Sequence, residues 1–453
     1  MMSSLSGWQW RGLVVALVAL VAANWLKPAP VIKPYEYEII NEIWTPQEQS
    51  ELADMVRSYS EFFSVISDQT PATDNIGEAV PYDPEKGCTH PLMVPSRNGS
   101  HCILAPRLDI GRHYVLTGGN TGLKESYDKL VSRLLSFAQF FIGSNKDALA
   151  QNIPLIDKLF ESPAYKKAVD KVCPGHPYLD PFQLGVIVQI PGQTVAMHYD
   201  APWFWGADRM QYPIWLLVVM HASGLFHDID LPQIQGVAYI HPWKVDNMTD
   251  ADIASTFGGS FFFHHEGPER APGRLAPRPG SAILLDGSKC IHGTDLYLPP
   301  GTTDAPMMQK DSKPSLVYSS KNTPTTPTRD TLWNVVADGK VVTTYKFSDL
   351  RIALVWRSKC FASKEEKRRY DNTPPLELSA ILERLRADLV KRNRIDKDAV
   401  IAPIDFATLL LNEYVNYPLP RNTWMPYNYC ALPRLFGEKQ GGIITSLLKP
   451  FCT

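Results

Sequence analysis

The sequence has no strong charge bias, no internal repeat and no low-complexity tail. Its 453 residues include 45 Lys and Arg against 47 Asp and Glu, which gives a formal net charge of −2. Nucleic-acid-binding domains carry a basic excess, so this balance argues against a nucleic-acid partner. The lack of repeats argues against a solenoid. With 44% hydrophobic residues, the chain can form one large core or two modest ones.

Long hydrophobic runs are equally scarce, and the longest lies near the N-terminus. Residues 12–26 form a largely apolar run of about 15 residues, shorter than the roughly 20 that a membrane-spanning helix needs. The run fits the hydrophobic region of a secretory signal peptide, with Val21-Ala22-Ala23 as an acceptable cleavage site. Aromatic residues at its edges instead favour an uncleaved signal-anchor; these are Trp8, Trp10 and Trp25.

Arg11 precedes the apolar run, which would place the bulk of the chain on the luminal side of the membrane. We therefore predict that residues 1–30 are a signal-anchor or a signal peptide. The protein would be a single-pass protein of the endoplasmic reticulum or Golgi membrane with a luminal catalytic domain, or else a secreted protein. Two glycosylation sequons agree with this location, with Asn98 and Asn247 as the acceptors.

Cysteine is sparse, with seven residues in the chain. In the secretory pathway an odd number suggests disulfides and one free thiol. We expect Cys88 to pair with Cys102, which closes a loop rich in Pro and polar residues. We expect Cys430 to pair with Cys452, which ties down the C-terminal tail. Cys290 is the expected free thiol.

A histidine and an aspartate at His198-Tyr199-Asp200 form the first half of a candidate metal site. Residues 182–190 are rich in branched side chains and predict a strand. Pro191-Gly192 indicates a turn, after which an extended stretch leads to His198. Residues i and i+2 of a strand share a face, so both side chains can reach one ion.

His292 is the expected third ligand. Pro279-Gly280 predicts a turn before a short apolar strand that ends at Leu285, and His292-Gly293 follows on the next element. Two imidazoles and one carboxylate on one face of a metal leave three positions open, which suits a non-haem Fe(II) centre. His198, Asp200 and His292 are therefore the predicted metal ligands.

Further along the chain, Asp338-Gly339 joins two apolar runs and predicts a β-hairpin. The next strand, residues 351–357, has an arginine at each end. With these features the chain resembles the Fe(II)/2-oxoglutarate-dependent dioxygenase superfamily: strand, Pro-Gly, His-x-Asp, then Pro-Gly, strand, His-Gly and a late arginine. The resemblance covers roughly residues 176 to 360.

The resemblance implies a mainly β fold with flanking helices, a double-stranded β-helix or cupin-like jelly roll. It also implies Fe(II), 2-oxoglutarate as co-substrate, and O2. Arg351 would pair with the C5 carboxylate of 2-oxoglutarate, since a guanidinium can bind a carboxylate through two hydrogen bonds. Arg357 would lie near the C1 end, as in the AlkB-type branch, and Gln189 lies where members often contact the co-substrate.

The connection between His292 and Arg351 departs from the family pattern. Residues 293–350 lie between them, where the family usually has a short connection. We therefore expect an inserted loop at residues 298–331, which is rich in proline. Arg278 and Arg329 are alternative partners for the C5 carboxylate.

The aromatic run Trp203-Phe204-Trp205 follows the first two metal ligands and is the candidate substrate-binding wall, because a loop leaving the metal-bearing strand passes the pocket mouth. The alternative is that one or two of these rings close the barrel. Five further histidines lack a comparable setting and are read as loop or surface residues: His221, His227, His241, His264 and His265.

The flanking regions predict helices and loops. Thr45-Pro46-Gln47-Glu48 is a capping box that opens a helix. Apolar spacing predicts further helices at 123–142 and 378–389, and residues 70–107 read as a loop. We expect four regions: the segment 1–30, a helical and loop region at 31–175, the dioxygenase domain at 176–362, and an aromatic and Pro-rich extension at 363–453.

The predicted function is hydroxylation, by an Fe(II)- and 2-oxoglutarate-dependent dioxygenase, of a peptidyl residue or a small molecule in the secretory pathway. Two alternatives remain open. One is a type II luminal glycosyltransferase that uses Asp228 and Asp230 to hold a metal and a nucleotide sugar. It would need alternating strands and helices, which the sequence does not show around Asp228. The other is a non-catalytic cupin-like binding module, which would bind no iron.

Overall fold

The computed structural model describes residues 33–64, 80–96, 98–120, 122–142, 155–308, 311–319, 331–418, 427–436 and 438–452. The predicted signal segment 1–30 and Arg329 lie outside these ranges. Among the described residues, no helix combines the length and the apolar character that crossing a membrane requires.

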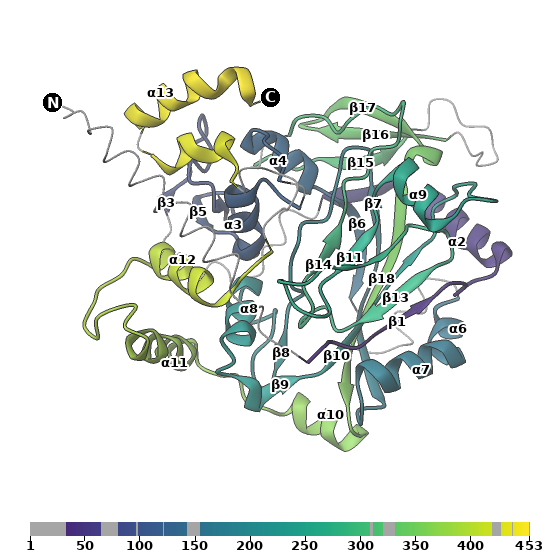
Figure 1. Ribbon diagram of the computed structural model, residues 1–453, viewed down its shortest axis with the longest axis horizontal. Helices are drawn as coiled ribbons and strands as arrows, with labels where there is room; N and C mark the ends of the chain where they lie inside the picture. Colours follow the sequence, from purple (N-terminus) through teal and green to yellow (C-terminus); the bar gives the residue numbers. More distant parts are fainter. Residues whose placement is uncertain are drawn as a thin grey trace, which may run out of the picture.

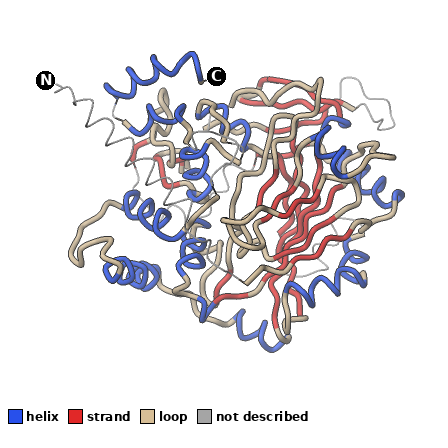
Figure 2. Tube along the Cα trace, viewed as in Figure 1, coloured by secondary structure: helices blue, strands red, loops and turns tan. Residues whose placement is uncertain are grey.

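A large twisted sheet forms the centre of the molecule (Figures 1 and 2). All of its strand pairs are antiparallel. Its ten strands, in spatial order, are β1 (Tyr37–Ile40), β13 (Ala282–Leu285), β10 (Gln233–Tyr239), β18 (Arg351–Phe361), β7 (Tyr178–Gln189), β6 (Phe137–Ile142), β2 (Glu61–Ser64), β15 (Ser315–Tyr318), β16 (Leu332–Ala337) and β17 (Lys340–Lys346).

A smaller sheet lies over part of the large one. It comprises β12 (Gly273–Leu275), β11 (Phe261–Phe263) and β14 (His292–Thr294). Isolated bridges from Gln193 to Tyr297 and from His198 to His292 continue the pairing along residues 193–198. The two sheets enclose an apolar core that includes Val237, Phe261, Phe263, Ala353 and Val355. The expected sheet-rich fold with flanking helices is therefore confirmed.

Helices cover the opposite face of the large sheet. They are α2 (Pro46–Ser58), α6 (Ile156–Glu161) and α7 (Pro163–Val172). The capping box predicted at Thr45 is present, with reciprocal hydrogen bonds between Thr45 and Glu48. Because side chains alternate along a strand, Ile352, Leu354 and Trp356 of β18 pack in the helix-side core. The intervening residues 351, 353, 355 and 357 face the smaller sheet.

A second group of helices packs beside the open end of the two sheets (Figure 1). Its apolar core joins α8 (Ile214–Ser223), α11 (Leu378–Lys391) and α12 (Pro403–Tyr414). The helix expected at 378–389 is thus confirmed. The other helices are α3 (Leu108–Thr117), α4 (Tyr127–Leu134), α9 (Asp250–Phe257), α10 (Lys364–Asp371) and α13 (Glu438–Leu448), with short 3-10 turns η2 (His227–Ile229), η4 (Phe347–Asp349), η5 (Tyr429–Leu435) and η6 (Lys449–Phe451).

The helix predicted at 123–142 is wrong in its second half. The helical part, α4, starts at the Ser126 N-cap and ends at Leu134. Residues 137–142 instead form β6, which pairs with β7. The phenylalanines that fit a helical stripe also satisfy a strand, and pairing with a central strand decides between the two.

Two predicted loops contain strands. Within residues 70–107, β3 (Val80–Pro81), β4 (Met93–Pro95) and β5 (His101–Leu104) form a small sheet. Within the insertion at 298–331, β15 pairs with β2 and β16 and so extends the large sheet. The predicted hairpin is confirmed: Asp338 and Gly339 both have positive φ, 50° and 74°, between β16 and β17, as a type I′ turn requires.

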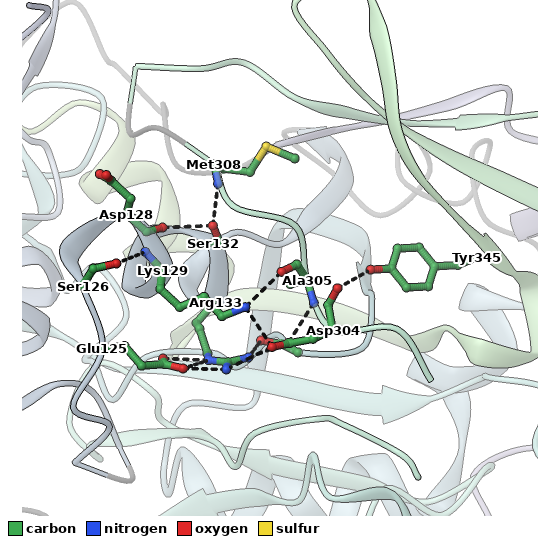
Figure 3. Close-up of polar contacts among 11 residues, drawn as sticks. Glu125, Ser126, Asp128, Lys129, Ser132, Arg133, Asp304, Ala305, Met308 and Tyr345 are labelled. Atoms are coloured by element: carbon green, nitrogen blue, oxygen red, sulfur yellow. Dashed lines mark hydrogen bonds and ion pairs between the residues drawn. The ribbon is translucent and has the colours of Figure 1, made fainter. Parts of the chain in front are cut away.

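An ionic network around the buried side chain of Arg133 holds the insertion against α4 (Figure 3). Arg133 of α4 donates two hydrogen bonds to Glu125 through Nε, at 3.1 and 2.8 Å, and one to Asp304 through Nη1 at 2.8 Å. The same Nη1 donates to the carbonyl of Gly192, in the turn that precedes the metal-binding segment. Lys129 adds a second ion pair to Asp304. The insertion is therefore fixed to the turn that leads to His198.

Both predicted disulfides are confirmed, Cys88–Cys102 and Cys430–Cys452. Cys290 is free and buried, as expected. A third disulfide, Cys173–Cys360, was not predicted. It joins the end of α7 to the end of β18 across a sequence separation of 187 residues, which no spacing argument could reveal.

Candidate metal centre

The structure brings His198, Asp200 and His292 together. Their ligand atoms all lie within 4.8 Å of one another, and all three side chains are buried. The backbones of His198 and His292 are paired by two hydrogen bonds, of 2.9 and 3.0 Å. Asp200 Oδ1 lies 3.7 Å from His198 Nε2, and Oδ2 lies 3.8 Å from His292 Nε2. The chain thus presents two imidazoles and a carboxylate to one point.

Both imidazoles are held in the orientation that metal ligation requires. The ring of His198 contacts the carbonyl of Ala196 through Nδ1 at 2.6 Å, and that of His292 contacts the carbonyl of Cys290 at 2.8 Å. A carbonyl only accepts, so each Nδ1 carries a proton, which leaves Nε2 as the atom of each ring that can bind a metal. Burial lowers the pKa of His292 to about 3, so its ring is neutral near pH 7.

His292 Nε2 is buried and has no hydrogen-bond partner among the described residues. Buried polar atoms are almost always satisfied, and an unsatisfied imidazole nitrogen beside a carboxylate fits a metal ligand. The set of two nitrogens and one oxygen matches the facial triad of non-haem Fe(II) sites. The residues present therefore fit an Fe(II) ion.

Arg357 orients the carboxylate ligand of the candidate triad, Asp200. Its Nη2 donates to Asp200 Oδ1 at 2.7 Å and its Nε donates to Oδ2 at 3.2 Å. Gln235 of β10 accepts from the same Nε at 3.3 Å. Burial alone would raise the pKa of Asp200, but the guanidinium outweighs burial and holds this pKa well below its usual value. Asp200 is thus a carboxylate, and it is oriented by two hydrogen bonds.

Gly287, in the turn after β13, leaves room for the ligands. A Cβ at this position would lie 2.4 Å from Asp200 Oδ2 and 2.9 Å from His292 Cε1. Its carbonyl also accepts from the Asp200 amide at 2.9 Å. The Asp286-Gly287 turn therefore packs directly against the metal-binding side chains, and any larger residue would displace them.

Arg351 lies at the other end of the same strand face, six residues from Arg357. It is 2% exposed and donates to the carbonyl of Gly259 at 3.0 Å, to Tyr239 Oη at 3.1 Å and to Gln189 Oε1. The Gln189 amide nitrogen is buried without a partner among the described residues. Arg351, Gln189 and Tyr239 thus form a buried cluster rich in hydrogen-bond donors, which suits an anionic group.

A cavity of about 250 Å³ opens beside the metal centre. His198, Asp200 and Arg357 line it, together with residues of the 91–111 segment and of α4. Its walls are mainly apolar, including Phe140, Phe182, Ile187, Leu134 and Ile214. Two further guanidinium groups line it, those of Arg107 and Arg209.

The three aromatic residues of the predicted substrate wall separate in the structure. Trp203 lines the cavity and packs on Phe182, with ring centroids 4.7 Å apart. Phe204 is fully buried in the helical core with α8, away from the cavity lining. Trp205 packs on Tyr370. Because side chains alternate in β8 (Trp203–Phe204), neighbouring rings cannot share one wall.

Other sequence candidates lie elsewhere. Arg278 pairs with Asp250 on the surface at 2.8 Å. Asp228 pairs with Arg384, and Asp230 lies in β9 (Asp230–Leu231), paired antiparallel with β8. Of the five histidines read as loop or surface residues, His241 and His264 lie in loops, outside the helices and strands, and are buried. Their backbone partners satisfy them: Pro277 for His241 and Arg270 for His264.

Sequence reasoning missed two contributors to the site, Gln235 and Tyr239. Both are on β10, with Gln235 beside Arg357 and Tyr239 beside Arg351. The odd-numbered positions of residues 233–239 carry Gln, Gln, Val and Tyr, an alternation that indicates one polar face. The signal was present, but only the register with β18 shows which arginines this face meets.

No family model matches the sequence, and no curated protein matches it. Solved structures that match include a prolyl-4-hydroxylase from Pseudomonas putida, at 11% identity over 76% of this chain and 98% of that chain, with a TM-score of 0.27. A prolyl hydroxylase from Trichoplax adhaerens, in complex with a hypoxia inducible factor peptide fragment, matches at 9% identity over 81% and 97%, with a TM-score of 0.30. HygX from Streptomyces hygroscopicus, with nickel and 2-oxoglutarate bound, matches at 8% identity over 72% and 83%, with a TM-score of 0.30.

Replacing Arg357 by Met should move metal binding to higher pH. Asp200 has a depressed pKa in the folded protein because of Arg357. Without the guanidinium, burial raises this pKa, and a protonated carboxylate does not bind a metal. We expect the midpoint of anaerobic Fe(II) binding, titrated between about pH 4 and pH 8, to shift upward. Arg209→Met is the matched control, since Arg209 lines the same cavity but donates to Gln183. An unshifted midpoint in Arg357→Met would contradict the assigned role.

Proposed function

We propose that this protein is an Fe(II)- and 2-oxoglutarate-dependent dioxygenase that hydroxylates its substrate. The observation that carries the proposal is the triad His198, Asp200 and His292, with a buried, unsatisfied Nε2 on His292 and a cavity that His198 and Asp200 line. The open face of such a centre accommodates a bidentate co-substrate and dioxygen.

The two sheets support a double-stranded β-helix. The segment that ends at His198 follows β7 of the large sheet after the Pro191-Gly192 turn, and an isolated bridge pairs His198 with His292 of β14 in the smaller sheet. The chain returns to the large sheet at β18, which lies between β7 and β10. This crossing between two facing antiparallel sheets is the arrangement of a jelly roll.

Different residues of the chain would bind the metal, orient its carboxylate ligand and bind the co-substrate. The triad would hold Fe(II), and Arg357 would keep Asp200 ionised and oriented. Arg351, Gln189 and Tyr239 would bind the C5 carboxylate of 2-oxoglutarate through hydrogen bonds. When bound, iron and 2-oxoglutarate supply the oxidising power, through decarboxylation of the co-substrate to succinate.

The cavity favours a substrate with a largely apolar body and a negatively charged group. Asp200 is the one carboxylate among the lining residues, and Arg357 already pairs with it. Arg107 donates to the carbonyl of Tyr199, and its buried Nε has no partner among the described residues. An anionic peptide side chain or small-molecule acid would therefore find a donor at the cavity wall.

Neither alternative function fits the site as well. A nucleotide-sugar transferase would need a parallel α/β sheet, whereas the described strands pair antiparallel around Asp230. A binding module without catalysis gives no reason for a buried carboxylate held between two oriented imidazoles. A module that binds no metal would leave the buried Nε2 of His292 without a partner, which is costly.

Anaerobic addition of Fe(II) and 2-oxoglutarate tests the function. We expect the metal-to-ligand charge-transfer absorption of a 2-oxoglutarate chelate, and its loss in Asp200→Ala and His292→Ala, because each substitution removes a ligand. His176→Ala, a histidine outside the site, is the control. Wild-type absorption and iron content in Asp200→Ala would rule out the triad.

Truncation of Arg351 tests the position of the co-substrate. Arg351→Ala leaves the C5 carboxylate without its partner in a desolvated place, which should cost about 2–5 kcal/mol of binding. The apparent KM for 2-oxoglutarate should rise roughly 30-fold to several thousand-fold. Arg278→Ala should leave it unchanged, since Arg278 pairs with Asp250 on the surface. If the apparent KM for 2-oxoglutarate rises in Arg278→Ala alone, the C5 carboxylate binds at Arg278 and not at Arg351. Arg351→Lys tests whether a positive charge without the planar guanidinium is enough to bind the carboxylate.

We propose a luminal or secreted location, on the basis of the N-terminal apolar run, the disulfides and the sequons. Asn98 and Asn247 are both exposed, and Asn247 has a positive φ of 63° in a surface turn. Both acceptors are thus accessible to glycosylation, and three disulfides are expected where oxidising conditions prevail.

Expression in eukaryotic cells tests this location. The protein should lose mass on glycosidase treatment, and the loss should be smaller in Asn98→Gln and Asn247→Gln and absent in the double variant. In intact microsomes, protease should spare nearly the whole chain. Cleavage of the C-terminal region from outside the vesicles would refute the luminal topology.

A further inference from the structure

A second group of metal-ligand side chains lies beside α8, apart from the triad. His221, His227 and Asp230 each place one ligand atom within 4.8 Å of the others. His221 Nδ1 and Asp230 Oδ1 are both buried, and neither has a hydrogen-bond partner among the described residues. Since buried polar atoms are nearly always paired, two unsatisfied atoms in one cluster point to a ligand that binds both.

Short, fixed elements bring these three residues together. His221 is in the last turn of α8, which ends at Ser223. Gly224 caps the helix with a φ of 71°, a left-handed conformation that reverses the chain. His227 then lies in η2 and Asp230 at the start of β9. The rings of His221 and His227 lie 5.9 Å apart between centroids.

Among the described residues, Asp230 has a partner for one carboxylate oxygen only, so the other oxygen can bind a cation. Lys289 Nζ lies 3.1 Å from Asp230 Oδ2, so the other oxygen, Oδ1, is the unsatisfied one. Asp228, although close in sequence, pairs with Arg384 at 3.2 Å and does not join the cluster. His227 is exposed. An ion can therefore reach the cluster from solvent, and the side chain of His227 has room to move toward it.

We propose that His221, His227 and Asp230 bind Zn²⁺, with water as the fourth ligand. Two imidazoles and a carboxylate match the ligand preference and tetrahedral number of zinc. Ligand atoms within 4.8 Å of one another can reach the bond lengths of about 2.0–2.2 Å that zinc requires through a small movement of the exposed His227 side chain.

The zinc site would brace the candidate iron centre. Tyr199, between His198 and Asp200, lies edge-on to the His221 ring with centroids 6.3 Å apart. Asp230 pairs with Phe204 in β8, four residues beyond Asp200. Zinc would therefore join the end of α8 to β9, and through β8 to the segment that carries two of the iron ligands.

Zinc titration of the full chain tests the proposal in a background without the triad. His198→Ala/His292→Ala, stripped with a chelator, should bind one Zn²⁺ per chain, and Zn²⁺ should raise its Tm by mass action. Adding His227→Ala should weaken binding by more than the roughly 10–100-fold that loss of an outer-shell partner costs. It should also abolish the rise in Tm. Asp230→Asn, which keeps the side-chain shape, should act likewise, and His176→Ala should not.

The outcomes separate this site from the triad. If the background protein binds no Zn²⁺, or if His227→Ala and Asp230→Asn bind it as tightly as their parent, the proposal is wrong. If the His198→Ala/His292→Ala variant does not fold, as judged by circular dichroism, the number of Zn²⁺ ions bound per chain is measured instead in protein with the wild-type triad. There, His227→Ala should bind one Zn²⁺ fewer than the parent, and an equal count would overturn the site. Neither result depends on 2-oxoglutarate or turnover.

Discussion

The backbone pairing of His198 with His292 is the constraint on which the candidate active site depends. Two hydrogen bonds fix the register between residues 193–198 and β14. Because strand side chains alternate, a shift of one residue would turn either imidazole to the opposite face. The same pairing positions Asp200, two residues after His198, where its carboxylate accepts hydrogen bonds from Arg357. Ligand geometry is thus a consequence of register between two segments about 90 residues apart in sequence.

Because side chains alternate on β18, this one strand contributes residues both to the helix-side core and to the candidate active site. Even-numbered residues such as Leu354 and Trp356 pack against the helices, whereas Arg351 and Arg357 face the smaller sheet. Six residues separate the two arginines, which is about 20 Å along a strand. One end of this face holds a metal ligand, and the other holds a buried cluster of donors. The apolar residues Ala353 and Val355 lie between them.

The surroundings stabilise this arrangement at several points. Arg133 connects α4, the 298–331 insertion and the turn at Gly192. Replacing Arg133 would remove these hydrogen bonds together with its ion pairs to Glu125 and Asp304. The Cys173–Cys360 disulfide joins the far end of β18 to α7. The insertion therefore lengthens the chain between His292 and Arg351 without loosening the strands that carry them.

Sequence alone indicated the three side chains that the structure brings together as the candidate triad, the two local disulfides, the capped helix at Thr45 and the hairpin at Asp338-Gly339. These depend on short-range patterns: strand periodicity, turn residues and capping, which act within a few residues. Tertiary structure decided the rest. Strand pairing turned residues 137–142 from helix to β6, packing removed Phe204 from the cavity, and the register of β10 with β18 brought Gln235 and Tyr239 to the arginines. The physical reason is that contacts between distant segments decide between local alternatives of similar energy.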